Sequence, residues 1–367
     1  MCCRHWTPRN GRAESSQHGR RPRCGRHSRQ TLPAADDFAA FRPPPSLRSG
    51  HLQSLLGSSA LRRRVVRRRA GDLAAAAEVW TLDGGDDVRL QGLYSPQPGG
   101  GRGLAVLLHG WEGNVDSNYL LGSGARLFAA GFDVFRLNFR DHGDTHHLNP
   151  GLFHSCRLEE VVHALADLQD RLQARRWCLA GFSLGGNFSL RVGLRAPGAG
   201  LDIGRIVAVC PVIDPAGAMV SMERGFRFYE RYFERKWSRS LKAKQVAFPD
   251  LYGHESWYDI KSLRARTHYL ATRHAGFASA EAYFEGYSVA RGRLARLSVP
   301  ATLLTAADDP IVPVEDFHRL PDNPRLEPII SRYGGHCSFL KNWKFDSLAE
   351  DVIERRFSEA ADAAHGA

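Results

Sequence analysis

From about residue 71 onward, short apolar runs alternate with longer segments in which apolar residues recur every three or four positions. The clearest run is 104–108 (LAVLL), which glycines flank and which is typical of a strand buried on both faces. The clearest helical pattern is 158–172, an amphipathic segment. This alternation of strands and helices predicts an α/β fold with a mostly parallel sheet covered by helices on both faces.

The same reading predicts further elements on either side of these two. Residues 78–82 and 88–94 flank an Asp-Gly-Gly-Asp turn and predict an antiparallel hairpin. Gly131 and Pro197 are expected to end two helices. The other predicted strands are 133–139, 177–180, 206–210, 302–305 and 326–331, and the other predicted helices are 123–130, 183–195 and 347–364.

Residues 215–297 interrupt this alternation, because they are rich in aromatic and basic residues and lack a strand pattern. They predict a helical cap inserted between two strands, at the edge of the sheet where ligands bind. The core is then expected in two parts, 71–214 and 298–367. Ahead of it, 1–37 reads as a disordered Arg-rich extension and 38–70 as a basic N-terminal arm.

The net charge of +11 belongs to the N-terminal end of the chain. Residues 1–70 contain 16 Arg against Glu14, Asp36 and Asp37, so they carry +13, whereas the remainder has 34 basic and 36 acidic residues. The run 62–69 is expected to be a solvated arm or helix face, since no aromatic residues interleave with its arginines. The alternative is an arm that binds a phosphate backbone or anionic lipid.

Other features bear on location and metals. No stretch approaches 18 apolar residues and the first 35 contain no apolar signal core, so we expect no integral membrane segment and a cytoplasmic protein. The cysteines number seven and no C-x-x-C pair occurs, which favours free thiols in a reducing compartment and argues against structural zinc.

The strongest chemical signal is Gly181-Phe182-Ser183-Leu184-Gly185, placed between a predicted strand and a predicted helix. Small residues on both sides of a serine allow a sharp strand-to-helix turn that exposes its hydroxyl above the sheet. Ser183 is therefore the candidate nucleophile. The Leu184 amide, at the helix N-terminus, is the candidate donor to a developing oxyanion.

A serine nucleophile needs a base and an acid that orients the base. With this turn, the expected chain order is Ser, then Asp or Glu, then His. Asp308 and Asp309 follow the strand ending at 305, and His336 follows the strand ending at 331. We favour Asp309 as the acid, because it lies one residue further from its strand; Asp308 is the alternative.

The second oxyanion donor should follow the 104–108 strand, where Trp111 offers its amide. His109 is expected to form a hydrogen bond within this loop rather than act as a base. Residues 141–147 contain three histidines and two aspartates, so a metal site is conceivable there. Their spacing does not match binuclear zinc hydrolases, and we expect a loop at the rim of the pocket.

Six segments of the chain, in order, resemble the YheT-like branch of the α/β-hydrolase superfamily, also called AB-hydrolase-1 or UPF0017. The resemblance covers roughly 38–357 and implies an eight-stranded α/β-hydrolase core and esterase-type activity. It implies Ser183 as nucleophile, the Asp308-Asp309 pair as acid and His336 as base. The chain departs from the pattern at Asp141-His142, where glycine and a small residue are usual. The segments are HLQSLL…LRRR, LLHGWEG, NFRDHGD, GFSLGGN, HAGFASAEAYF and AADDPIVP…GGHCSF.

Together these features predict a serine hydrolase that cleaves carboxylic esters of short- to medium-chain acids through Ser183, Asp309 and His336. Its expected partner is a small-molecule ester, a lipid among the candidates, with no nucleic acid, cofactor or metal. One alternative is an alcohol O-acyltransferase with the same triad. The other is a non-catalytic binding protein that uses its basic arm. The sequence makes no prediction of oligomeric state.

Overall fold

An eight-stranded sheet forms the centre of the computed structural model, which describes residues 38–365. Its strand order is β1-β2-β4-β3-β5-β6-β7-β8; β2 is antiparallel to both β1 and β4, and every other neighbouring pair is parallel. The predicted disorder of 1–37 lies outside the described residues. The predicted fold class is confirmed. The strands are β1 (Glu78–Asp83), β2 (Arg89–Ser95), β3 (Leu104–Leu108), β4 (Asp133–Leu137), β5 (Trp177–Phe182), β6 (Ile203–Val209), β7 (Ala301–Ala306) and β8 (Leu326–Ser331).

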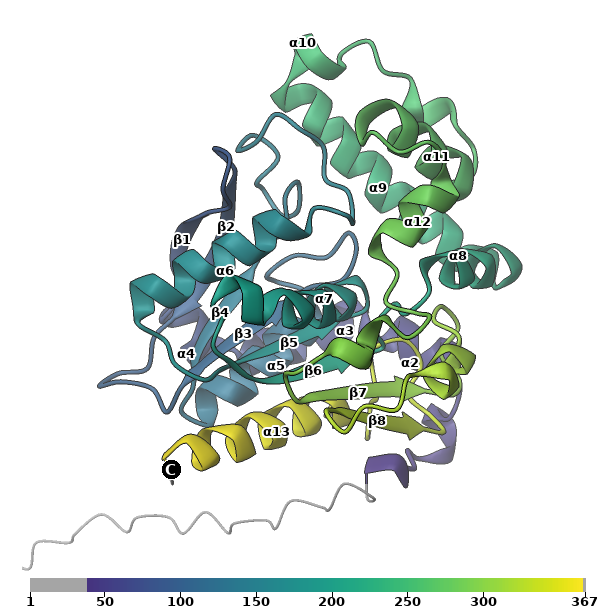
Figure 1. Cartoon of the computed structure of the whole chain (residues 1–367). Helices are drawn as coiled ribbons and strands as arrows, with labels where there is room; N and C mark the ends of the chain where they lie inside the picture. The colour runs from purple at the N-terminus through teal and green to yellow at the C-terminus, as the bar shows by residue number, and fades with distance from the viewer. Residues whose placement is uncertain (1–37, 366–367) are drawn as a thin grey trace, which may run out of the picture. The chain divides into compact units, whose positions relative to one another are not determined.

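Helices cover both faces of this sheet (Figure 1). On one face α6 (Leu158–Leu172) and α7 (Leu184–Ala199) pack against a cluster that includes Val106 of β3. On the other, α5 (Asn118–Ala129) and α13 (Leu348–His365) pack against a cluster that includes Leu107. Successive residues of β3 are thus buried on opposite faces, which explains why this strand reads as one continuous apolar run.

Every predicted strand is present, with ends shifted by at most three residues, but two helices differ from expectation. Helix α5 begins at Asn118 rather than at 123, and its glycines allow close packing against α13: a Cβ at Gly122 would lie 2.1 Å from Glu350 Oε1. Helix α7 continues through Pro197 to Ala199. Pro197 falls in the last turn, where it costs few hydrogen bonds, and Gly200 ends the helix in a left-handed conformation.

The segment predicted as a basic arm is packed against the body of the protein. It forms α2 (Gly50–Gly57), α3 (Ala60–Arg69) and α4 (Gly71–Ala75). Arg62 is buried, and its guanidinium pairs with Glu350 of α13 at 2.9 Å. Only the outer face of α3 is the solvated helix face that its arginines predict. The expectation of a solvated arm or helix face did not include the buried side of α3, because the carboxylate that compensates the Arg62 charge lies far away in sequence.

Residues between β6 and β7 form the predicted helical insertion, called the cap from here on. In Figure 1 it forms a separate helical layer beyond the sheet. Its helices are α8 (Pro215–Arg224), α9 (Arg227–Ala247), α10 (Pro249–Tyr252), α11 (Leu263–His274) and α12 (Ala280–Tyr287). Across the described range 38–365, none of the helices is both long and apolar enough to span a bilayer.

Candidate active site

Ser183 lies at the sharp turn between β5 and α7. Its backbone has φ 55° and ψ −116°, which a non-glycine residue rarely adopts. The turn closes because its neighbours lack side chains: a Cβ at Gly181 would lie 2.1 Å from Gly185 O, and one at Gly185 would lie 2.4 Å from His109 O. The glycines of the motif are therefore required by close backbone approach, as the sequence indicated.

Three side chains from separate loops form one hydrogen-bonded chain. Ser183 Oγ lies 2.9 Å from His336 Nε2. His336 Nδ1 lies 2.9 Å from Asp309 Oδ2 and 3.1 Å from Oδ1. The loops follow β5, β8 and β7, whose carboxyl ends share one edge of the sheet. The structure therefore brings together the three residues favoured as nucleophile, base and acid.

The two neighbouring aspartates have different partners. Asp309 Oδ1 accepts hydrogen bonds from the amides of Ile311 and Val312, which orient it towards the imidazole. Asp308 does not contact the imidazole; its Oδ1 accepts the Gly335 amide at 2.8 Å and so supports the backbone beside His336. The geometry gives Asp309 the position of the acid and Asp308 the position of a loop support.

The environment of His336 favours a charged imidazole. Burial alone would lower its pKa, but the Asp309 carboxylate and the neighbouring Cys337 together outweigh burial and raise the pKa well above the usual 6.5. An imidazolium formed by proton transfer from Ser183 would therefore be stabilised where it forms.

The two candidate oxyanion donors flank the serine. Leu184 is the first residue of α7 and Trp111 lies in the loop after β3. Neither amide donates a hydrogen bond to any residue of the described chain, 38–365, so both are available to a ligand. The Trp111 loop is held by His109, whose Nδ1 bonds to Gly110 O at 2.7 Å, as expected for a loop histidine. Tyr119, which sequence reasoning missed, accepts the Gly110 amide at 3.0 Å.

The loop that carries His336 depends on α2, another contribution the sequence analysis missed. Ser54 Oγ accepts the His336 amide at 2.8 Å. Gln53 is fully buried; its side chain donates to Leu340 O at 3.1 Å and accepts the Leu340 amide at 2.7 Å. The HLQSLL motif carried the signal, but its partners stand more than 280 positions away and no local pattern reveals them.

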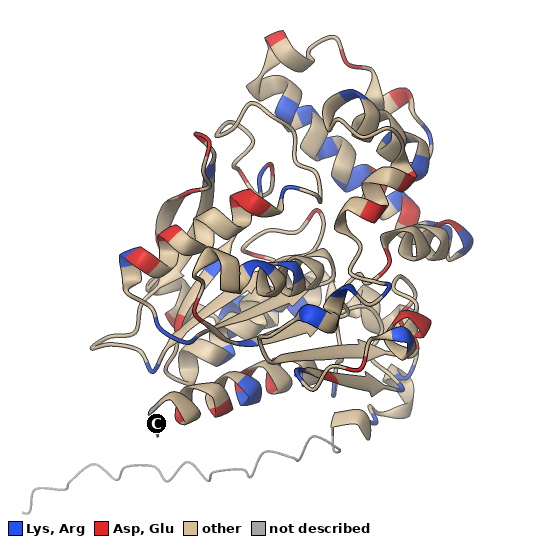
Figure 2. Cartoon of the chain, viewed as in Figure 1, with Lys and Arg blue, Asp and Glu red and all other residues tan. Residues whose placement is uncertain are grey.

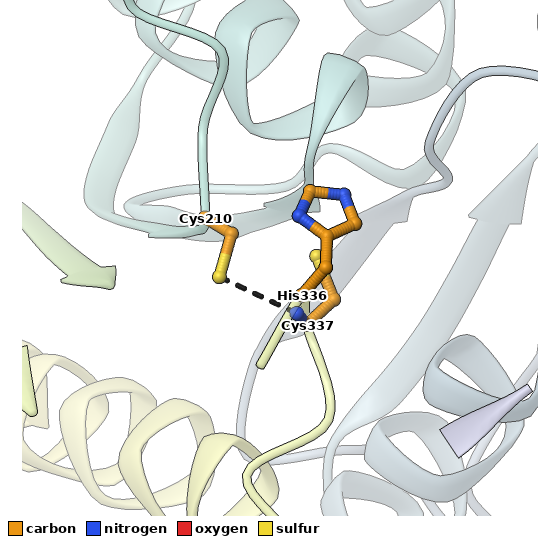
Figure 3. A group of neighbouring side chains, drawn as sticks. All are labelled: Cys210, His336 and Cys337. Atoms are coloured by element: carbon orange, nitrogen blue, oxygen red, sulfur yellow. Dashed lines mark hydrogen bonds between the residues drawn. The ribbon is translucent and has the colours of Figure 1, made fainter. Parts of the chain in front are cut away.

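Two buried thiols lie beside the imidazole (Figure 3). Cys210 Sγ accepts the Cys337 amide at 3.4 Å, and with His336 the two cysteines form the one group of three possible metal ligands within residues 38–365. Both nitrogens of His336 already have partners, Ser183 and Asp309. A metal ion bound here would compete with the catalytic hydrogen bonds, so the group does not fit a metal that assists catalysis.

The histidine-rich loop 141–147 anchors the cap. Asp141 Oδ1 pairs with the buried Lys244 of α9 at 2.6 Å. His142 accepts the Glu112 amide at 3.2 Å, and His146 lies 2.9 Å from Ser240 of α9. These side chains are committed to internal partners, which explains the unusual Asp141-His142 pair without a metal.

Aromatic and polar contacts join α9 to the candidate oxyanion loop. The Trp111 ring stacks on Phe233, with centroids 5.2 Å apart, and meets Trp237 edge-on at 5.1 Å. Lys236 Nζ donates to Glu112 O at 2.9 Å. The position of the cap is therefore coupled to the loop that offers the Trp111 amide.

Two cavities meet at Ser183, and Trp111 and Phe233 line both. The first, the apolar cavity, has a volume of about 120 Å³ and lies among cap side chains such as Met219 and Phe284. The second, the polar cavity, has a volume of about 110 Å³ and lies towards α3 and α5. His336 lines the polar cavity and not the apolar one.

Comparison with known proteins decides the family. Residues 105–345 match the model of the alpha/beta hydrolase family. The chain belongs to this family. It is also 26% identical to the "Putative esterase YheT" of Escherichia coli K12, over 84% of this chain and 91% of that protein. It is 26% identical to the "Putative esterase slr0264" of Synechocystis sp., over 86% and 91% respectively. The predicted YheT-like resemblance is confirmed.

Solved structures support the hydrolase fold. An esterase of Pyrococcus furiosus, Pf2001, aligns with a TM-score of 0.51 and 17% identity, over 78% of this chain and 93% of that one. A membrane phospholipase A described as a bacterial virulence factor aligns with a TM-score of 0.51 and 16% identity, over 84% and 92%. At these identities the likeness concerns the fold alone.

Proposed function

We propose that this alpha/beta hydrolase cleaves carboxylic esters with Ser183 as nucleophile, His336 as base and Asp309 as the acid that orients it. The observation that carries the proposal is the chain of hydrogen bonds from Ser183 Oγ through both nitrogens of His336 to Asp309. The two relatives named as esterases support the same chemistry.

The reaction runs in two halves. Ser183 Oγ attacks the ester carbonyl while His336 Nε2 takes its proton, and the Trp111 and Leu184 amides stabilise the oxyanion. His336 then gives the proton to the departing alcohol, which leaves an acyl group on Ser183. Water, activated by the same imidazole, hydrolyses the acyl-enzyme, releases the carboxylic acid and restores the serine hydroxyl.

The two cavities suggest how an ester lies across the serine. The imidazole must reach the oxygen of the departing alcohol, so that alcohol belongs on the side lined by His336. The acyl chain would then occupy the apolar cavity, whose lining of aromatic and aliphatic cap residues suits a hydrocarbon chain. Its size favours short- to medium-chain acids.

The test is hydrolysis of a p-nitrophenyl ester series, from acetyl to long-chain acyl, by wild type and Ser183→Ala. We expect turnover with a chain-length optimum, and its loss in the variant. Ser123→Ala is a matched control, since Ser123 is also buried but its hydroxyl has no hydrogen-bond partner in the described chain. Equal activity in Ser183→Ala and wild type would refute the proposal.

Acyl transfer to an alcohol is the second candidate, because the polar cavity beside His336 could admit an alcohol in place of water. The same assay with a graded concentration of added alcohol separates the two. An ester product formed at the expense of free acid supports transfer. Free acid as the sole product supports hydrolysis.

A further inference from the structure

The polar cavity differs from the apolar one in the charge of its lining. Three basic residues line it: Arg62, Arg63 and Lys236. Among the described residues around this cavity, none is Asp or Glu. Hydroxyl groups of Ser58, Ser117 and Tyr119 add possible hydrogen-bond donors. A cavity with excess cations and no carboxylate is suited to an anion.

Two of these cations are available to a ligand. Arg62 is not, because it is buried against Glu350. Arg63 is exposed on α3 and makes no ion pair within residues 38–365. Lys236 likewise has no carboxylate partner in that range; its Nζ contacts Glu112 O and lies 5.1 Å from the centroid of the Tyr232 ring.

The side chain of Glu112 does not cancel the charge of Lys236. Burial raises the pKa of Glu112 to about 8, although nearby Lys236 acts in the opposite direction. The raised pKa favours the neutral form of this carboxyl. In Figure 2, Lys and Arg follow α9 along its length, so this wall of the cavity belongs to a basic helix.

We propose that the polar cavity is a leaving-group subsite for an alcohol that carries an anionic group, a phosphate or a carboxylate, held by Arg63 and Lys236. The proposal rests on the proposed function, because it is the position of His336 that makes this cavity the alcohol side. It deepens that function by naming a substrate class: esters with an apolar acyl chain and a negatively charged alcohol.

The experiment compares four esters of one acyl chain. Their alcohols are glycerol 3-phosphate, glycolate, glycerol and choline, so the departing alcohol carries a phosphate group, a carboxylate group, no charge or a positive charge. For wild type we expect kcat/KM to be at least about tenfold higher for one of the anionic esters than for the glycerol ester, and lowest for the choline ester. Whichever anionic ester is faster identifies phosphate or carboxylate as the preferred group.

Variants locate the effect. Arg63→Gln and Lys236→Met should each reduce the ratio of anionic to neutral kcat/KM by about tenfold. Arg64→Gln is the matched control: Arg64 is exposed on the same helix, carries the same charge and does not line the cavity. The ratio should be unchanged in this control. A wild-type ratio near one, or an equal fall in Arg64→Gln, would overturn the proposal.

A binding measurement separates this proposal from the proposed function. Calorimetry of Ser183→Ala with glycerol 3-phosphate, glycolate and glycerol needs no turnover. Binding of an anionic alcohol that is lost in the Ser183→Ala/Arg63→Gln double variant supports the subsite even if no ester is hydrolysed. Absence of binding, together with normal hydrolysis of p-nitrophenyl esters by wild type, leaves the esterase standing and refutes the subsite.

Discussion

Two regions of the molecule are built in different ways: the cap, and the loops that carry Ser183, Asp309 and His336. The loops extend directly from buried parallel strands, and short hydrogen bonds hold each side chain. The contacts that attach the cap include Lys244 of α9, which bonds to residues of the loop 141–151, and aromatic rings around Trp111. The sheet thus supplies the chemistry, whereas the cap supplies one wall of each cavity and so bears on substrate choice.

The largest effect should come from the two adjacent aspartates. Asp309→Asn removes the group that holds the His336 tautomer, and we expect kcat to fall by about 10⁴-fold. Asp308→Asn should cost far less, because Asp308 contacts the Gly335 amide and not the imidazole. Steady-state kinetics on one p-nitrophenyl ester measure both. A greater loss in Asp308→Asn would reverse the assignment of the acid.

The next largest effect should be a loss of stability when the ion pair that attaches the cap is broken. Lys244→Met leaves the buried Asp141 carboxylate without its partner, and breaking such a pair costs about 3–5 kcal/mol. Urea denaturation should show this fall in the free energy of unfolding. Lys242→Met, at an exposed position on the same helix, is the control and should change it little. Equal stabilities of the two variants would mean that Lys244 does not anchor the cap.

The junction between loop and cap offers a smaller effect. Tyr119→Phe removes the acceptor of the Gly110 amide next to Trp111. A donor loop that is less well positioned stabilises the transition state less, so we expect kcat to fall by about tenfold with KM unchanged. A change in KM alone would instead indicate that Tyr119 acts on substrate binding.

The pH dependence is the mildest test. His336 must be neutral to accept the serine proton, and its pKa is raised well above 6.5. The kcat/KM should therefore be low at acidic pH and rise through a pKa above 6.5. In Asp309→Asn the loss of the carboxylate should move the midpoint of this rise in kcat/KM to lower pH. An unchanged midpoint in that variant would contradict the role of Asp309.

Local patterns in the sequence predicted the chemistry far better than the supporting contacts. The Ser183 turn and the strands ahead of Asp309 and His336 are short-range features, and strand order places them on one edge. The supports of these residues were not predicted. Ser54 reaches His336 across 282 positions, and Lys244 reaches Asp141 across 103. Such pairs depend on packing between segments that no periodicity connects.

The same reason explains two sets of contacts that the sequence did not predict. Arg62 looked like part of a solvated run because its partner, Glu350, lies in the last helix. Residues 141–147 were expected to form a loop at the rim of the pocket, with a metal site as the alternative, and the partners of Asp141 and His146 in α9 could not be inferred from that spacing. In both cases the side-chain types were informative, but the charge compensation could be seen only in three dimensions.

The central claim, that Ser183 is the activated nucleophile, is tested most directly by covalent labelling. Wild type and Ser183→Ala are treated with a fluorophosphonate probe, and the modified peptide is located by mass spectrometry. We predict one adduct in wild type, on the peptide that contains Ser183, and none in the variant. An adduct on another residue, or none in a wild-type protein that circular dichroism shows to be folded, would contradict the account.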